Sequence, residues 1–192
     1  MDAARAVFVE ESFERANLDE VARRAGIAKG TIYRYFDSKA ELYVEVLVGT
    51  ANVFDERMRK TLDPSLSPSE QIARVARFYF EHYTTQNEYF RIFWAIENQQ
   101  LIGDLPDELV RAVTDRWRSS LEIVAGVIER GIREGEFAPC DPWVAANIFW
   151  VTTNAVIQTG EVAARRELWG REMREVFDHT LELLLRGMRS KA

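Results

Sequence analysis

The sequence predicts an all-α protein with a small N-terminal helical module and a larger C-terminal one. Apolar residues recur at helical spacing along most of the 192 residues, and no segment shows the period-2 alternation of a strand. The segment "TLDPSLSPS" at 61–69 contains two prolines and four serine or threonine residues, which is typical of a linker. We therefore expect one domain at 1–60 and a second at 61–192.

The first helix of the N-terminal module has an apolar face and ends close to the start of the second helix. Ala4, Val7 and Phe8 form that face, and the helix is expected to end near Ser12. The second helix is expected to begin at Asn17.

Capping residues set the bounds of the next helices. Asn17 can accept a hydrogen bond from the backbone three residues on while Glu20 reaches back, as in a capping box. Gly26 supplies the left-handed conformation that ends the second helix. A third, short helix is expected at about 28–35. Ser38 and Glu41 form a second capping box, which predicts a fourth helix through Lys60.

The C-terminal module is expected to contain five helices. Turn-forming residues separate the segments that have helical periodicity. The helices are predicted at about 68–85, 88–100, 107–134, 142–164 and 168–189, with the last break near Arg165.

Two short helices joined by a glycine-containing turn fit a helix-turn-helix, whose second helix enters the major groove of DNA. On a helical wheel, Lys29, Gly30, Tyr33 and Arg34 fall within an arc of about 140°, and Ile32 falls elsewhere. Gly30 costs roughly 1 kcal/mol relative to alanine in a helix. The missing side chain would let the helix backbone come close to a duplex.

The polar residues of this segment are suited to contact phosphates and base edges. Lysines act as point charges on phosphates, tyrosines contact them through their hydroxyls, and arginine and threonine can reach base edges. The candidates are Lys29 and Lys39 for phosphate, Tyr33 and Tyr35 through their hydroxyls, and Thr31 and Arg34 for bases.

Charge is unevenly distributed along the chain. The formal net charge is −6, which by itself argues against a nucleic-acid partner. Between residues 22 and 39, however, five basic residues stand against the single acid Asp37. These are Arg23, Arg24, Lys29, Arg34 and Lys39. One end of the molecule is expected to be basic and the other acidic.

The run "DEVARRAGIAKGTIYRYFDSKAELY", within residues 3–47, closely resembles the DNA-binding domain of the TetR/AcrR transcriptional regulators. It meets every literal position of the family pattern AG-x-x-KGT-x-Y-x-YF-x-SK-x-x-L. Three departures are visible: Ser12 replaces a glycine, Ala28 replaces a capping serine, and the basic arm usual before the position of Met1 is not in this sequence. Either the functional start lies upstream or this regulator lacks that arm.

The resemblance implies a homodimer that binds a double-stranded DNA operator and a small-molecule effector. It implies that most DNA contacts come from six residues, with Asn17 as a further phosphate contact. The six are Lys29, Thr31, Tyr33, Arg34, Tyr35 and Lys39. Gly30 is the position at which the backbone would approach DNA.

The aromatic residues of the C-terminal module predict a pocket for an apolar or aromatic compound, although most aromatic stripes on helices simply form core. Polar groups close to these aromatic residues would fix the orientation of the ligand. The candidates are Phe78, His82, Tyr83, Phe93, Trp94, Glu97, Trp117, Asn147, Trp150 and Asn154.

Apolar stripes on the last two helices predict a dimer interface in which two helices from each protomer form a four-helix bundle. The alternative is that these faces close the core of the monomer. The candidate interface residues are Val151, Ala155, Val162, Phe177, Leu181, Leu184 and Met188.

Composition limits the other function classes. Cys140 is the only cysteine, and only two histidines are present, so neither a cysteine-based nor a histidine-rich metal site is expected, and no cofactor. No apolar run is long enough for a membrane span, which predicts a soluble cytoplasmic protein. We expect a ligand-responsive regulator, most simply a repressor. The alternatives are a helical adaptor that uses the same module for protein contacts and a small helical enzyme, for which no catalytic motif is present.

Overall fold

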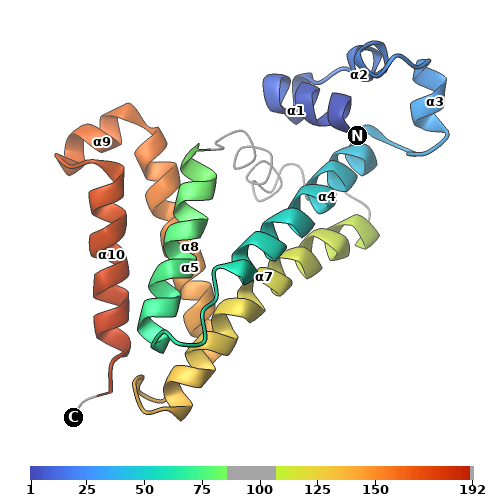
Figure 1. Ribbon diagram of the computed structural model, residues 1–192. Coiled ribbons are helices and arrows are strands. Elements are labelled where there is room, and N and C mark those ends of the chain that lie inside the picture. The colour runs from blue at the N-terminus through green and yellow to red at the C-terminus, as the bar shows by residue number, and fades with distance from the viewer. Residues whose placement is uncertain (86–106, 191–192) are drawn as a thin grey trace. The chain divides into compact units, whose positions relative to one another are not determined.

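The computed structural model describes residues 1–85 and 107–190, and every regular element in these ranges is a helix (Figure 1). The described residues form two compact units. The N-terminal unit comprises 1–55 and the described part of 85–117, and the C-terminal unit comprises 56–84 and 118–190. The helices are α1 (Asp2–Arg15), α2 (Leu18–Ala25), α3 (Lys29–Tyr33), α4 (Lys39–Lys60), α5 (Pro68–Thr85), α7 (Asp107–Arg133), α8 (Pro142–Glu161), α9 (Ala163–Trp169) and α10 (Met173–Met188).

The predicted all-α fold is confirmed, and most helix bounds agree to within two residues. Helix α1 continues three residues past the predicted end at Ser12. The helix predicted at 88–100 lies outside the described residues. The prediction for the last two helices is wrong, because α8 ends at Glu161 and the segment after it contains two helices. Gly170, with φ 57°, ends α9 in the left-handed conformation and separates it from α10.

The two predicted capping boxes are each only half formed. The side chain of Asn17 accepts from the amide of Asp19, two residues on, and Glu20 binds arginines instead of reaching back. At α4, the amide of Glu41 donates to Ser38 as expected, at 3.1 Å. The carboxylate of Glu41, however, accepts from the amide of Asp37 and not from that of Ser38.

The core of the N-terminal unit fixes α1, α2 and α3 against the first half of α4. Phe8 and Phe13 both pack on the ring of Tyr43, with ring centroids 4.9 and 5.0 Å away. Ile32 is 4% exposed and anchors α3 in this core. The other buried members include Ala4, Val7, Leu18, Val21, Ala22, Leu42, Val44 and Val46. Burial of these residues is what holds the short helix α3 in place, because five residues form no stable helix alone.

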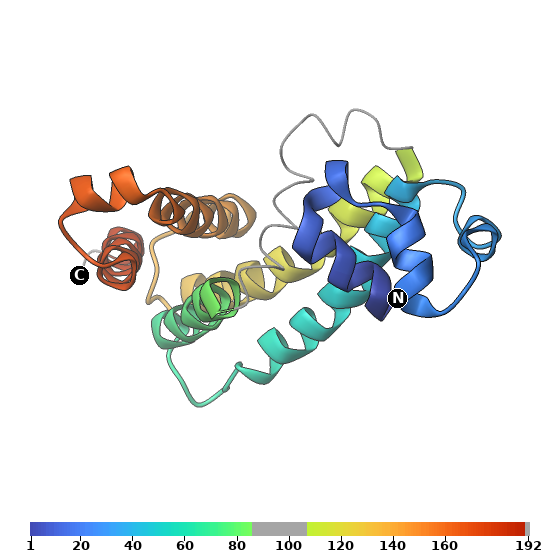
Figure 2. The ribbon, with the colours of Figure 1, turned by 90° about the horizontal axis from the view of Figure 1, so that it is seen from above.

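The C-terminal unit is held together by aromatic packing and by a close approach at a glycine. Phe80 of α5 stacks on Phe177 of α10 with centroids 4.2 Å apart. The ring of Phe137, 1% exposed, lies where a side chain at Gly131 would be, so only glycine fits at that position. Helices α8 and α10 lie side by side in Figures 1 and 2 and are in contact.

The segment at 61–67, predicted to be a linker, is bound to the C-terminal unit. The guanidinium of Arg130 donates to the carbonyl oxygen of Leu66 at 2.7 Å and to that of Pro64 at 3.3 Å. The side-chain amide of Gln71 donates to the backbone carbonyl of Asp63. These bonds pair backbone carbonyls that a free linker would leave to water.

A membrane span is not found in the described part of the chain, where every helix is too short or too polar to cross a bilayer.

Candidate DNA-binding surface and ligand cavity

The turn between α2 and α3 has the geometry that the sequence predicts. Gly26 adopts φ 67°, and its amide donates to the carbonyls of Ala22 and Arg23. The amide of Ile27 also donates to Ala22, at 3.0 Å. This is the Schellman arrangement, which closes the end of α2 and directs the chain into α3.

Helix α3 presents a polar face to solvent. The side chain of Tyr33 is 50% exposed and that of Tyr35 is 68% exposed. Lys29, Gly30 and Arg34 are exposed as well, and Thr31 is half-buried. Of the six candidate positions from 29 to 35, five are exposed and Thr31 is half-buried, and Arg34 and Tyr35 follow the last residue of α3.

The presence of glycine at position 30 has no explanation in contacts within the protein. A Cβ built on Gly30 meets no atom within 4 Å, and its φ is not positive. Neither packing nor backbone strain requires glycine here, unlike at Gly131 or Gly26. A methyl group at position 30 would therefore fit within the protein itself.

Asn17 and Lys39 lie outside α3, at the start of α2 and of α4. Asn17 is exposed and caps α2. The ammonium of Lys39 donates to the carbonyl of Ala16 at 3.2 Å and lies 4.7 Å from the centroid of the Phe13 ring. Lys39 thus ties α4 to the end of α1, in addition to any contact with phosphate.

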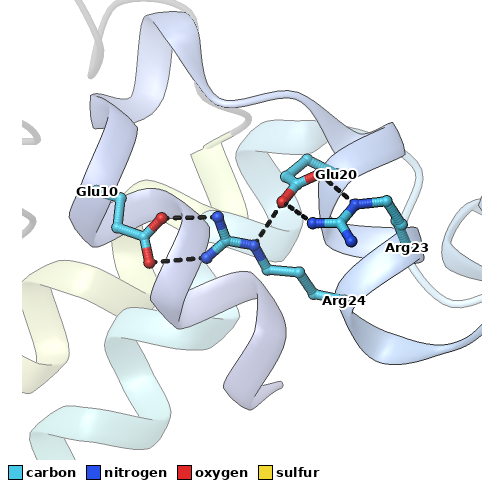
Figure 3. Close-up of polar contacts among 4 residues, drawn as sticks. All are labelled: Glu10, Glu20, Arg23 and Arg24. Carbon is cyan, nitrogen blue, oxygen red and sulfur yellow. Dashed lines mark hydrogen bonds and ion pairs between the residues drawn. The ribbon is translucent and has the colours of Figure 1, made fainter.

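Four charged side chains join α1 to α2 (Figure 3). The guanidinium of Arg24 binds Glu10 through two nitrogens at 2.7 Å, and its Nε donates to Glu20 at 2.6 Å. Arg23 binds both oxygens of Glu20, at 2.6 and 2.7 Å. Hydrogen bonds from Arg23 and Arg24 lower the pKa of Glu20 from 4.5 to about 2. The cluster stays ionised over the whole physiological pH range.

The charge count over residues 22–39 overstates the basic excess, because acidic residues outside this range form ion pairs with basic residues inside it. Glu10 and Glu20 neutralise Arg23 and Arg24. Asp19 of α2 binds the ammonium of Lys29 with 2.8 Å between Nζ and Oδ2. Three of the five basic residues are therefore ion-paired, and the basic excess near α3 is smaller than the sequence indicates.

The C-terminal unit contains an apolar cavity between α5, α7 and α8, with Met58 from the end of α4. Its volume is about 40 Å³, which leaves room for only a few water molecules. The lining has almost no polar surface. It comprises Met58, Ile72, Val75, Ala76, Tyr79, Ser120, Leu121, Val124, Ala146, Phe149, Trp150 and Thr153.

The polar groups of Tyr79 and Trp150 in the cavity lining have hydrogen-bond partners. The hydroxyl of Tyr79 donates to Oδ1 of Asn154 at 2.8 Å and accepts from Nε1 of Trp150 at 3.1 Å. Asn154 is 3% exposed. Because these groups satisfy one another, the cavity presents mainly hydrocarbon to whatever enters it.

Of the predicted ligand contacts that lie in the described residues, only Trp150 lines this cavity. Asn154 does not line the cavity, but it accepts a hydrogen bond from Tyr79, which does. The amide of Asn147 instead donates to a backbone carbonyl of its own helix, and Trp117 packs against the core of the N-terminal unit. His82 stacks on Phe78 and meets Tyr83 edge-on, and none of these three lines the cavity. Phe93, Trp94 and Glu97 lie outside the described residues.

The predicted dimer residues fall into three groups by exposure. Val151, Ala155 and Val162 are exposed, with Val151 at 56% and Val162 at 50%. Phe177 and Leu181 are buried in the protomer itself, at 1% and 4%. Leu184 and Met188 are half-buried. Val144 and Ile148, which belong to the same predicted stripe, are also exposed and extend it along α8 at helical spacing.

Two family models match the chain, one in each half. Residues 1–46 match the N-terminal model of the tetR family of bacterial regulatory proteins, and residues 65–158 match a tetracyclin repressor-like C-terminal domain. The chain belongs to the TetR family of transcriptional regulators. It is thus a DNA-binding regulator with a helix-turn-helix and not an enzyme.

Similar proteins of this family extend over most of the chain. An HTH-type transcriptional regulator of Bacillus subtilis, YhgD, is 29% identical over 76% of this chain and 74% of its own. The fatty acid metabolism regulator protein of the same organism is 24% identical over 100% of this chain and 94% of its own. Among solved structures, FadR from B. subtilis in complex with stearoyl-CoA matches with a TM-score of 0.76, 24% identity, and coverage of 98% and 97%. The structural likeness shows that the fold is shared.

Proposed function

We propose that this TetR-family regulator is a homodimeric repressor whose two α3 helices bind a palindromic operator, and that an effector with a long apolar chain releases it. The observation that carries the DNA-binding part is the exposed face of α3, where Gly30 faces open space between tyrosine and basic side chains. A helix backbone that is bare on one face can come within contact distance of DNA. The neighbouring side chains then reach phosphates and base edges.

The chemistry of the cavity supports an effector with a hydrocarbon chain. The hydroxyl of Tyr79 is already paired on both sides, so the wall offers few polar groups to orient a polar ligand. A slender alkyl chain gains most from such a lining through burial of apolar surface. Relatives point the same way, since one is a regulator of fatty acid metabolism and a solved structure contains stearoyl-CoA. We infer that the effector is a long-chain acyl compound.

The small volume of the cavity supplies a mechanism for release. A long acyl chain does not fit in about 40 Å³, so its binding requires α5, α7 and α8 to separate. Met58 lines the cavity near the end of α4, and Tyr43 near the start of the same helix lies in the core that fixes α3. Displacement of α4 would change the separation of the two recognition helices. The effector then lowers DNA affinity by its preference for the expanded state.

The dimer is proposed to form through the exposed apolar stripe of α8 and the neighbouring surface of α10. Val144, Ile148 and Val151 are between 48% and 56% exposed, and Leu183 of α10 is 68% exposed. Exposed apolar residues at helical spacing on adjacent helices are costly in water and suit a two-fold helical interface. Two-fold symmetry would give the operator its inverted repeat.

Selection of binding sites from random-sequence DNA by the purified protein tests the DNA-binding proposal. We expect an enriched inverted repeat whose half-sites are one helical turn or a multiple apart. Enrichment of a site without two-fold symmetry would contradict the dimer arrangement. No enrichment at all would contradict the repressor proposal and favour the adaptor alternative.

Tryptophan fluorescence tests the effector proposal, because Trp150 lines the cavity and donates to Tyr79. Stearoyl-CoA, free stearate and coenzyme A alone would be titrated into the protein and into the complex with the selected duplex. We expect the two acyl compounds to change the fluorescence and release the DNA, and coenzyme A alone to do neither. The Trp150→Phe variant identifies the reporting residue. Equal effects of coenzyme A with and without the acyl chain would contradict a hydrocarbon effector.

A further inference from the structure

One ion pair stands between the recognition helix and its proposed phosphate partner. The ammonium of Lys29, the first residue of α3, lies 2.8 Å from Oδ2 of Asp19 on α2. Both side chains are open to solvent, with Lys29 44% and Asp19 60% exposed. A phosphate that Lys29 contacts would have to replace this carboxylate or share the lysine with it.

We propose that Asp19 competes with DNA phosphate for Lys29 and thereby lowers the affinity of the regulator for DNA and the salt dependence of binding. The inference rests on the proposed function, since it assumes that Lys29 contacts a phosphate. Asp19 is a tuning residue and contacts no base. Its carboxylate holds the lysine in the free protein and repels phosphate when the lysine leaves.

The solvent exposure of the pair makes the exchange feasible. A pair between two exposed side chains is weak, so Lys29 can move from Asp19 to a phosphate at small cost. Arg24 of α2 is held more firmly, because it bridges Glu10 and Glu20 and its side chain is only 29% exposed. Asp19 is therefore the acid whose removal frees a cation on α3 without breaking the contact between α1 and α2.

Counterions give the competition a measurable signature. When Lys29 binds a phosphate, the DNA releases a cation, but the vacated Asp19 attracts one from solution. The cation taken up at Asp19 therefore cancels part of the gain in affinity that comes from cation release by the DNA. Without the carboxylate, affinity should rise, and it should fall more steeply as salt is added.

The structural alternative is that the pair serves only to dock α3 on α2. In that case the Asp19→Asn variant would loosen α3, and DNA binding would weaken instead of tightening. The backbone amide of residue 19 keeps its bond to Asn17 in the variant, because that bond involves no side-chain atom of Asp19. Core burial of Ile32 also stays unchanged.

The test compares four proteins, namely the parent, Asp19→Asn, Lys29→Met and the double variant. The probes are the duplex selected from random DNA and a scrambled duplex of the same composition, each titrated at several salt concentrations. Glu122→Gln makes the same change in net charge at an exposed residue of α7 and is the control. Thermal unfolding checks that all variants are folded.

We expect Asp19→Asn to bind both duplexes roughly two- to tenfold more tightly at low salt, with a salt slope steeper by about one ion per protomer. The gain should disappear in the Lys29→Met background and should be absent in Glu122→Gln. Binding equal to or weaker than that of the parent would overturn the inference. An equal gain with and without Lys29 would also overturn it, since Asp19 would then act only as a negative charge. Failure of the parent to bind either duplex would instead overturn the proposed function.

Discussion

The proposed recognition surface on α3 and the apolar cavity differ in how each is built from the sequence. The surface comes from the continuous stretch 17–39, where two caps and a glycine turn orient α3. The cavity takes its lining from four helices, α4, α5, α7 and α8, between residues 58 and 153. Local chemistry therefore specifies the first, and long-range packing specifies the second. Variants at each site test separately the dependence on local chemistry and the dependence on long-range packing.

The largest effect is expected from Tyr33→Ala, which removes an exposed aromatic side chain from the face of α3. The side chain lies outside the core, so we expect the unfolding temperature to stay within about 2 °C of the parent. Loss of its contact at both half-sites should lower operator affinity about a hundredfold. Electrophoretic mobility shift with the selected duplex measures this change.

The conservative variant Tyr33→Phe separates the hydroxyl from the ring. If the hydroxyl contacts phosphate, the phenylalanine variant should lose much of the affinity that the alanine variant loses. Parental affinity in both variants would show that α3 is not the recognition surface.

The next largest effect is expected from filling the cavity. Ala146 of α8 is fully buried and lines the cavity, so Ala146→Val places two methyl groups inside it. We expect at least a tenfold loss of affinity for an acyl effector, because even one methylene changes the fit in an apolar pocket. Operator binding without effector should be unchanged. Fluorescence titration and a DNA-release assay measure the two properties.

Ala145→Val is the matched control for this variant. Ala145 is the preceding residue of the same helix and is also buried, but it does not line the cavity. If both variants lose effector binding equally, general overpacking of α8 and not occupation of the cavity is the cause.

The comparison also explains which features of the structure could be predicted from the sequence. Gly26, Ile32 and the exposed face of α3 follow from local rules on caps and periodicity, and the structure agrees. The pairing of Lys29 with Asp19 was not predicted, because charge was counted in a window that excluded α2's first turn. A contact between residues ten positions apart depends on how the turn folds back, which composition does not report.

The cavity was predicted in kind but mostly not in its residues. Trp150, one of the aromatic residues on which the pocket prediction depended, lines the cavity, and whether a ligand binds there stays a prediction. Aliphatic residues such as Val75 and Leu121 carry no signal that distinguishes a cavity wall from a packed core. Asn154 drew attention as a polar group, yet it serves to hold Tyr79.

A smaller effect sharpens the interpretation of the recognition surface. Gly30→Ala adds a methyl group where no protein atom lies within 4 Å. The variant should be stabilised by about 1 kcal/mol, because alanine is the better helix former. DNA affinity should nevertheless fall by roughly three- to tenfold if the helix backbone approaches the duplex closely.

Gly126→Ala of α7 is the control, because Gly126 also has open space around it. This variant should gain stability without loss of DNA binding. Unchanged operator affinity in Gly30→Ala would contradict a close backbone approach.

The smallest effect is expected from the cluster that joins α1 and α2. In the folded protein the pKa of Glu20 is about 2, against 4.5 for an unpaired glutamate. The carboxylate is therefore more easily protonated in the unfolded chain, and its contribution to stability is present above pH 4.5 and lost as the pH falls towards 2. Glu20→Gln should lower the unfolding temperature by roughly 1–3 °C near neutral pH, because its partners are partly exposed. The difference from the parent should shrink below pH 4.5 in calorimetric scans. A difference that is constant over this range would show that the ion pairs with Arg23 and Arg24 are not its cause.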